Sequence, residues 1–249
     1  MLPIKKIEGY VFDNTVHETL FKLSSNGIID SIDEPIASGK EAITFLGHID
    51  KTYLVAKIYK IETSNFKKLG KYIKGDYRFK NIKNEKRNLF LIWASKEYKN
   101  LTLAINNGVS VPVPIAREKN ILILSLVGTK EGNPHPKLIK FRKYDFEYVY
   151  SQIIENYAKL LYGAKIVHAD FSPYNILIDP ETQKITIIDM GQAVVHTHPK
   201  AKAFLKRDII NITDFLNKRA KNKITYEQFL EDLKNKKKEL YKNEVNKNE

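Results

Sequence analysis

Apolar residues return at helical spacing in several parts of this 249-residue chain. Residues 145–162 give the clearest case, because their apolar side chains fall on one wide face and Gly163 follows as a stop signal. Residues 14–27 form a shorter stripe, with Asn14 as a candidate N-cap. Each stripe predicts an amphipathic helix that buries one side. The pattern predicts five helices in total, over residues 14–27, 88–107, 145–162, 201–220 and 225–241.

Shorter apolar runs that are bounded by turn residues predict strands. Residues 120–127 are apolar at consecutive positions, which is typical of a central strand buried on both faces. The runs 176–178 and 185–188 flank a Pro-Glu-Thr turn and predict a β-hairpin. The remaining predicted strands are the two arms of a hairpin over 36–45 and single strands over 53–59 and 109–115.

Three polar side chains between His168 and Gly191 make little sense as core residues. Asp170, Asn175 and Asp189 have the spacing of the protein-kinase motif H-x-D-x-x-x-x-N followed by D-x-G. In that chemistry the first Asp receives the hydroxyl proton or orients the nucleophile, while the Asn and the second Asp hold Mg²⁺ on the phosphates. The oxygens of these two side chains are ligands that Mg²⁺ accepts. The alternative interpretation is a surface hairpin that carries acidic residues by chance.

Lys57 stands inside the apolar strand predicted over 53–59. A lysine in such a strand either extends along an edge to reach solvent or points toward an anion. Its V-A-K-I context resembles the third-strand lysine of kinases, which grips the α- and β-phosphates. Glu97 is the best candidate for a carboxylate that pairs with Lys57, with Glu85 as a competitor. A solvated glutamate on a helix surface is the alternative for Glu97.

The tip of the hairpin over 36–45 reads Ser38-Gly39-Lys40. Gly39 permits a tight turn whose N–H groups could face phosphate oxygens, and the side chains of Ser38 and Lys40 would add contacts. The Walker pattern GxxxxGK[ST] is absent, and a plain hairpin would have the same sequence. This turn is therefore a phosphate-binding candidate or an ordinary connection.

The central strand ends in Ser125-Leu126-Val127-Gly128. A hinge between two lobes belongs at this position. Main-chain groups at Ser125 and Val127 are the candidates for hydrogen bonds with an adenine.

Composition limits the class of protein. A hydrophobic share of 43% supports a real core, so global disorder is not expected. The absence of cysteine excludes disulfides, thiolate zinc sites and a cysteine nucleophile. Nothing near the N-terminus resembles a signal peptide, and no run reaches the length of a membrane span. We therefore expect a soluble cytoplasmic protein with no membrane partner.

The formal net charge of +13 favours attraction to a polyanion, with nucleic acid as the first choice. Between Lys57 and Lys99 there are 13 Lys and Arg against 4 Asp and Glu, a local excess of +9. Aromatic residues alternate with cations over 60–88, which suits RNA and equally suits a mobile insert that closes over a nucleotide. A generally lysine-rich surface is the alternative.

Several sequence blocks resemble the RIO family of atypical protein kinases: ASGKEA, VAKIY, EYKNL, HADFSPYNIL and IIDMGQA, in that order. The intervening KIETSNFK, YIKGDYRFK, WASKEYKNL and GVSVPVP are similar to the type-1 RIO subfamily. The resemblance covers about residues 31–215. It implies an α+β, bilobal protein-kinase-like fold, with a small antiparallel N-lobe and a mainly helical C-lobe whose substrate-binding region is truncated.

The resemblance also implies a domain organisation and partners. It divides the chain into an N-terminal helical extension over 1–30, an N-lobe over 31–127 with a basic flexible insert at about 60–88, and a C-lobe over 128–249. ATP and Mg²⁺, or Mn²⁺ in its place, would bind in the cleft. Because the family matures the small ribosomal subunit, the implied partner is a precursor of that subunit, with its rRNA and ribosomal proteins. The oligomeric state is left open.

Matching motifs imply roles for individual residues. Asp170 would be the catalytic aspartate, and Asn175 and Asp189 would bind metal. Lys57 would bind the α- and β-phosphates and pair with Glu97. The remaining contacts to the nucleotide are implied for Ser38, Gly39, Lys40, Ser125 and Val127.

The chain departs from ordinary kinases after Gly191. Only 58 residues follow, no A-P-E motif occurs, and D-M-G replaces D-F-G, so a conventional peptide-substrate site is not expected. RIO proteins are thought to act partly as ATPases that phosphorylate their own metal-binding aspartate, here Asp189. Autophosphorylation on serine is the rival mechanism.

Two other function classes remain as alternatives. The first is an RNA- or ribosome-binding pseudokinase module that uses nucleotide only structurally, although such a module has no need of all the catalytic residues together. The second is a small-molecule kinase of the aminoglycoside or choline type, which shares the H-x-D-x-x-x-x-N core. The short, basic C-terminal part offers little for a small-molecule pocket.

Overall fold

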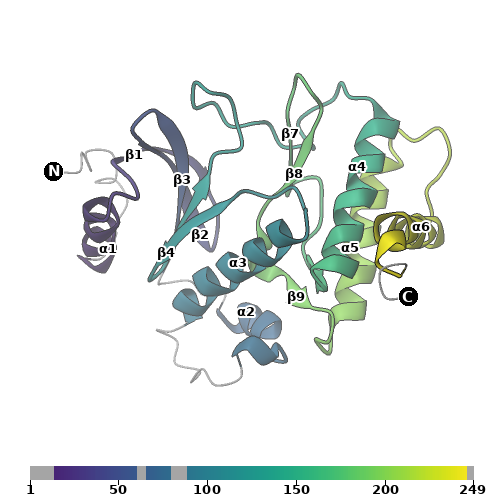
Figure 1. The fold of residues 1–249 in the computed structure, drawn as a ribbon, viewed down its shortest axis with the longest axis horizontal. Helices are drawn as coiled ribbons and strands as arrows, with labels where there is room; N and C mark the ends of the chain where they lie inside the picture. Colours follow the sequence, from purple (N-terminus) through teal and green to yellow (C-terminus); the bar gives the residue numbers. More distant parts are fainter. Residues whose placement is uncertain (1–13, 61–65, 80–88, 246–249) are drawn as a thin grey trace. The chain divides into compact units, whose positions relative to one another are not determined.

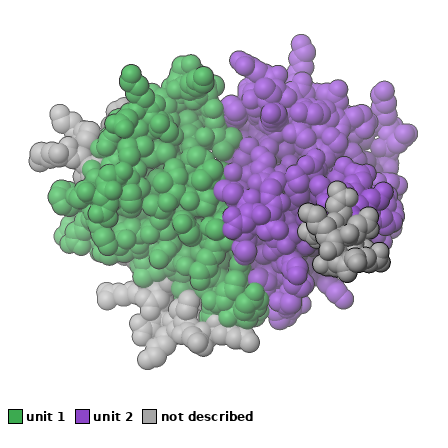
Figure 2. Space-filling model, in the orientation of Figure 1, with its two compact units in different colours: residues 1–102, 112–134 green, residues 103–111, 135–249 purple. Residues whose placement is uncertain are grey.

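The computed structural model describes residues 14–60, 66–79 and 89–245 and divides the chain into two compact units (Figure 2). Unit 1 comprises residues 1–102 and 112–134, and unit 2 comprises residues 103–111 and 135–249. The predicted basic insert over 60–88 lies partly outside the described residues. No helix within the described ranges has the length and apolar character needed to cross a membrane.

Unit 1 is built around an antiparallel sheet with the strand order β1-β2-β3-β5-β4 (Figure 1). The prediction of a central strand over 120–127 is confirmed, because β5 lies between β3 and β4 and its first four residues are buried. The strands are β1 (Ser31–Ser38), β2 (Ala42–Ile49), β3 (Thr52–Tyr59), β4 (Pro114–Glu118) and β5 (Ile121–Ser125).

The strand predicted over 109–115 is wrong in its position, because β4 begins only at Pro114. Pro112 and Pro114 have no N–H to donate to a ladder. In addition, the backbone of Ser110 is bonded elsewhere: its N–H donates to Asn156 Oδ1 at 2.7 Å and its carbonyl accepts from Ile187 N at 2.8 Å. The apolar residues at 109–113 therefore led to a predicted strand that begins five residues too early.

The two faces of β3 carry different side chains, since neighbouring residues of a strand point to opposite sides. Ala56 and Ile58 belong to an apolar core that also includes the buried side chains of helix α1 (Asn14–Ser25). Lys57 and Tyr59 lie on the other face, toward helix α3 (Leu89–Asn106). The helices predicted over 14–27 and 88–107 are thereby confirmed.

Part of the stretch over 60–88 is helical, with α2 (Phe66–Ile73) followed by a 3₁₀ turn (Tyr77–Phe79). Tyr72 and Phe79 are buried, whereas Tyr77 is exposed.

A set of buried polar residues ties this segment to α3. Arg78 forms two bonds with Asp76, at 2.9 and 2.7 Å, and donates to Asn100 Oδ1 at 2.9 Å. Lys96 is fully buried nearby, and its ammonium lies 5.8 Å from the centroid of the Trp93 ring. Burial and then the charge of Arg78 lower the pKa of Lys96 to about 7. We call Asp76, Arg78, Lys96 and Asn100 the buried polar cluster.

Unit 2 is mainly helical, which together with the sheet of unit 1 confirms the α+β prediction. Asp145 caps α4 by accepting a bond from Tyr148 N at 3.0 Å. The Tyr157 ring on α4 lies 4.8 Å from Phe171 and 6.5 Å from Phe229 on α6. The three predicted helices are confirmed as α4 (Phe146–Ala158, continued by a π-helical turn over Lys159–Gly163), α5 (Ala201–Leu216) and α6 (Tyr226–Val245).

Two short strand pairs of unit 2 frame its polar residues. The predicted hairpin is confirmed as β7 (Ile176–Ile178) and β8 (Ile185–Ile187). A second antiparallel pair joins β6 (Ile166–Val167) to β9 (Val194–Val195). The apolar strands are buried, so the polar residues that follow them are fixed at their ends.

Candidate functional site

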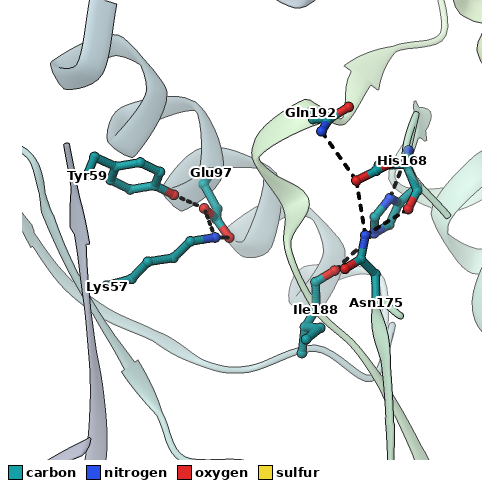
Figure 3. A network of polar contacts seen from close by, with 8 residues as sticks. Lys57, Tyr59, Glu97, His168, Asn175, Ile188 and Gln192 are labelled. Carbon is teal, nitrogen blue, oxygen red and sulfur yellow. Dashed lines mark hydrogen bonds and ion pairs between the residues drawn. The ribbon is translucent and has the colours of Figure 1, made fainter. Parts of the chain in front are cut away.

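Unit 1 contains an ion pair between Lys57 and Glu97 (Figure 3). The Lys57 ammonium donates to both carboxylate oxygens of Glu97, at 2.9 and 2.8 Å. The Tyr59 hydroxyl donates to the Oε2 atom of the same carboxylate. The predicted pairing of Lys57 with Glu97 is therefore present, whereas its competitor Glu85 lies outside the described residues.

Both side chains of this ion pair are largely buried. The Glu97 side chain is 1% exposed and that of Lys57 is 14% exposed. A buried carboxylate without partners would be strongly unfavourable, so the bonds from Lys57 and Tyr59 stabilise and orient Glu97. Lys57 remains the more accessible partner, which is the property that an anion-binding lysine requires.

The three residues predicted to contact phosphate at the hairpin tip have different surroundings. Ser38 ends β1, and Lys40 is exposed. The Gly39 N–H donates to Ala42 O at 2.9 Å, so this N–H is used inside the hairpin. Gly39 also has no positive φ, and an added Cβ would meet only Ala42 O at 3.5 Å. Packing does not require glycine here, and its lack of a side chain leaves the backbone open to close approach.

The predicted hinge residues lie at the end of β5. The Ser125 N–H donates to Val113 O, and the Ser125 hydroxyl accepts from Val113 N, both at 2.9 Å. These two bonds fasten Ser125 to the neighbouring segment. Val127 follows beyond the strand and is partly exposed. The adenine-binding role of both residues stays a prediction.

Unit 2 brings Asp170 and Asn175 together through hydrogen bonds. The Asn175 amide donates to the carbonyl of Asp170 at 2.9 Å and to its Oδ2 at 3.1 Å. The Asn175 N–H donates to Ser172 O, and the Ile188 N–H donates to Asn175 O, both at 2.9 Å. These two bonds hold the loop that precedes β7. The five-residue spacing seen in the sequence thus closes a loop around the Asp170 carboxylate.

His168 connects this loop to the segment that leads to Asp189. Its Nε2 lies 3.1 Å from Ile188 O, and its Nδ1 lies 3.3 Å from Asp170 N (Figure 3). A carbonyl can only accept, so Nε2 carries the proton and Nδ1 accepts from Asp170 N–H. The fully buried imidazole therefore sets the relative positions of Asp170 and the strand end before Asp189.

Burial raises the pKa of the Asp170 carboxyl, and the charge of Asp189 raises it further. The hydrogen bond from Asn175 and the charge of Arg207 act in the opposite direction. Asp189 itself has a left-handed backbone with φ of 64°, which is uncommon for a residue other than glycine. Two carboxylates in such surroundings are typical of a functional site.

The oxygens available in unit 2 fit Mg²⁺. Asn175 uses its Nδ2 to hold Asp170, and its Oδ1 accepts no bond from the described part of the chain. Asp189 supplies a carboxylate. Across the described ranges, no three His, Cys, Asp or Glu side chains cluster as a metal cage. Few protein ligands are sufficient for Mg²⁺, which keeps waters and takes phosphate oxygens.

Sequence reasoning did not assign the roles of Asp208 and Arg207 on α5. Asp208 is fully buried and accepts from Ala169 N at 2.8 Å, Phe171 N at 3.0 Å and the Tyr157 hydroxyl at 2.8 Å. Arg207 donates to the carbonyl of Ala169. Ala169 has a left-handed φ of 64°, which costs an L-residue about 1–2 kcal/mol. The pair therefore holds a strained residue directly before Asp170.

Tyr59 and Gln192 were also missed. Tyr59 stands two residues after Lys57, so strand alternation is the signal that would have placed its ring on the same face. Gln192 follows Asp189 by three residues, and no local pattern announces its contact with Asp170. Its Nε2 lies 3.3 Å from Asp170 Oδ2.

Residues 42–229 match the model of the RIO domain family. The chain is 38% identical over 215 residues to the RIO-type serine/threonine-protein kinase Rio1 of Haloferax volcanii, covering 86% of this chain and 72% of that protein. It is 42% identical over 168 residues to the Rio1 kinase of Thermoplasma acidophilum, covering 68% of this chain and 87% of that protein.

Solved structures with the same fold include two of the Rio2 kinase from Chaetomium thermophilum. One superimposes with a TM-score of 0.67 at 22% identity and covers 90% of this chain and 68% of that one. The other, an ADP/Mg²⁺-phosphoaspartate complex, gives a TM-score of 0.66 at 22% identity and covers 87% of this chain and 64% of that one. At this identity the likeness concerns the fold.

Proposed function

The chain belongs to the RIO domain family, and from that premise we propose that it is an ATP- and Mg²⁺-dependent serine/threonine-type protein kinase that also hydrolyses ATP. The observation that carries the proposal is the arrangement of Asp170 and Asn175. One amide holds the candidate catalytic carboxylate through its nitrogen and leaves its oxygen for a metal. A module that only binds nucleotide does not need one amide to hold a catalytic carboxylate and also to offer an oxygen to a metal.

Each polar set has a separate task on one ATP molecule. Lys57, oriented by Glu97, neutralises the α- and β-phosphates. Asn175 and Asp189 hold Mg²⁺, which supplies positive charge where negative charge develops on the transferred phosphoryl group. Asp170 orients the attacking group and takes a proton from a hydroxyl acceptor or from the water that cleaves an acyl phosphate. Catalysis by these residues is positioning and electrostatic stabilisation, with little covalent work for the protein.

Asp189 is the leading candidate for the phosphoryl acceptor. A carboxylate oxygen of Asp189 would attack the γ-phosphorus, and the bond to the ADP oxygen would break. Water would then cleave the acyl phosphate, so that one cycle converts ATP and water into ADP and phosphate. The Rio2 structure with the same fold contains a phosphoaspartate, which supports this proposal. Serine or threonine is the rival acceptor.

Labelling with γ-labelled ATP and Mg²⁺ is expected to leave an acyl phosphate on the protein. Hydroxylamine and alkali should release the label, because both attack an acyl phosphate and only alkali affects phosphoserine. An Asp189→Asn variant should carry none. Asp214→Asn is the matched control, since Asp214 is an exposed aspartate on α5. Acid treatment and mapping of the labelled peptide complete the measurement.

Other labelling results would change the proposal in defined ways. Acid-stable label that resists hydroxylamine indicates serine or threonine as the acceptor and the kinase reaction as the main activity. No label together with no ADP indicates a pseudokinase module that binds nucleotide structurally.

The Tyr59→Phe variant tests the ion pair of unit 1. It removes a donor to Glu97 and keeps the ring, so Lys57 loses part of its orientation. Because hydrogen bonds to charged groups contribute about 1.5–3 kcal/mol, we expect kcat/KM for ATP to fall roughly tenfold. Tyr53→Phe, on the same strand, should change kcat/KM less than about twofold. Equal losses in the two variants would remove the Tyr59 hydroxyl from this role.

We also propose a precursor of the small ribosomal subunit as the partner. The net charge of +13 supports a polyanionic partner, since such a charge raises association rates with nucleic acid. Binding to rRNA should then weaken steeply as the salt concentration rises. Nucleotide-dependent release from the particle would separate an ATPase switch from passive binding.

A further inference from the structure

Gln192 is a polar residue whose contact is not explained by the roles assigned above. Its Nε2 donates to Asp170 Oδ2 at 3.3 Å (Figure 3). Gln192 ends the 3₁₀ turn Met190–Gln192, which begins directly after Asp189. Met190 and Gly191 are buried, so the turn is anchored and only its last side chain reaches Asp170.

The strand pair β6–β9 explains why these two residues meet. Val167 of β6 is paired with Val194 of β9 in antiparallel register. Asp170 follows Val167 by three residues, and Gln192 precedes Val194 by two. In an antiparallel pair these two arms leave the same end of the ladder and run beside each other. The contact therefore follows from the register of a buried strand pair.

Both amide donors lie on one oxygen of the Asp170 carboxylate. Oδ2 accepts from Asn175 at 3.1 Å and from Gln192 at 3.3 Å. Among the described residues, none donates to Oδ1. Since two donors fix Oδ2, rotation of the carboxylate is opposed, and Oδ1 is the oxygen left to receive a hydroxyl proton.

The neutral amide is suited to this position. The charge of Asp189 already acts on Asp170, and a glutamate in place of Gln192 would add a third carboxylate. A glutamine supplies a donor of the same length without a charge. It also joins Asp170 to the turn that carries Asp189, so that the proton acceptor and a metal ligand are fixed by one segment.

We infer that Gln192 is a positioning residue that fixes the Asp170 carboxylate so that Oδ1 receives the proton of the attacking hydroxyl or water. This inference rests on the proposed function, because it needs Asp170 to be catalytic. Gln192 acts through Asp170 and makes no contact with ATP in this role. Its loss should therefore reduce kcat and leave KM for ATP almost unchanged.

The test is a double-mutant cycle measured as ADP formation from ATP and Mg²⁺. Gln192→Met keeps the length of the side chain and removes both N–H donors. We expect kcat to fall about tenfold, with KM for ATP within about twofold, for the loss of one oriented hydrogen bond. In an Asp170→Asn background the same substitution should cost less than about twofold, because the contact no longer serves a proton acceptor.

A matched control is available on α6, where Gln228 Nε2 donates to Asp232 Oδ1 at 2.8 Å at an exposed position. Gln228→Met should leave kcat unchanged. Urea unfolding of each variant checks that it folds, and Gln192→Ala replaces Gln192→Met if the latter does not.

The outcomes separate this inference from the proposed function. Wild-type kcat in Gln192→Met, or an equal loss in both backgrounds, would overturn the inference, since the residue would then be dispensable or only structural. If wild type and Asp170→Asn form ADP at the same rate, Asp170 is not catalytic, and the proposed function is overturned independently of Gln192. If Gln192→Met lowers kcat in the wild-type background but not in the Asp170→Asn background, the result supports both the inference and the proposed function.

Discussion

An Asp170→Asn variant is expected to bind ATP and Mg²⁺ but to form ADP roughly a thousandfold more slowly than wild type. The substitution preserves the shape of the side chain and an oxygen for the amide of Asn175, which lies 3.1 Å from Asp170 Oδ2. It removes the negative charge that would take a proton from a hydroxyl acceptor or from the water that cleaves an acyl phosphate. Nucleotide binding should persist, because Lys57 and Glu97 are untouched.

The measurement is steady-state ADP formation with excess ATP, with nucleotide affinity determined separately by calorimetry. Asp214→Asn should match wild type in both. ADP formation that survives Asp170→Asn would favour the structural use of nucleotide by an RNA-binding module. Loss of both affinity and turnover, with a lowered urea midpoint, would show that Asp170 supports the loop more than the reaction.

An Asp208→Ala variant is expected to lose about 3–5 kcal/mol of the free energy of unfolding. Asp208 is fully buried and accepts three hydrogen bonds, so its removal leaves two backbone N–H groups and a tyrosine hydroxyl without their acceptor. Ala169 would also lose one of the contacts that maintain its left-handed backbone. This loss is a large fraction of the stability of a typical domain, about 5–15 kcal/mol.

Urea unfolding followed by far-ultraviolet circular dichroism measures the effect, because unit 2 is mainly helical. Asp214→Ala lies on the same helix and is exposed, so its midpoint should stay close to that of wild type. Asp208→Asn retains one acceptor oxygen and should fall between the two. A midpoint for Asp208→Ala equal to that of Asp214→Ala would mean that the catalytic loop does not depend on α5.

Local patterns predicted the parts of the structure that local physics determines. Hydrophobic periodicity located the helices and most strands, because burial of one face sets the spacing. The pairing of Lys57 with Glu97 was predictable, since a lysine within an apolar strand needs a nearby anion. The contact between Asp170 and Asn175 was equally predictable, because a separation of five residues is enough to form a loop.

Contacts between distant segments were not accessible in the same way. Asp208 is 39 residues from Ala169 along the chain, and nothing in the sequence of α5 marks it as an acceptor for that loop. Gln192 meets Asp170 only through the register of β6 and β9. The error over 109–115 has a related cause, since the backbone of Ser110 is bonded to Asn156 and Ile187, far away in sequence.

The buried polar cluster makes the formation of unit 1 an event coupled to protons. Lys96 has its ordinary pKa of 10.5 in the unfolded chain and a pKa of about 7 in the folded unit, where it is fully buried. Folding therefore releases a proton at any pH between these values. By linkage, the folded unit gains stability as the pH rises from about 7, by up to about 1.4 kcal/mol per pH unit. Below pH 7 the ammonium is buried with its charge, beside Arg78, and the stability of the unit is at its lowest. Near neutral pH, the helix that carries Glu97 is thus sensitive to acidity through the residue that precedes it.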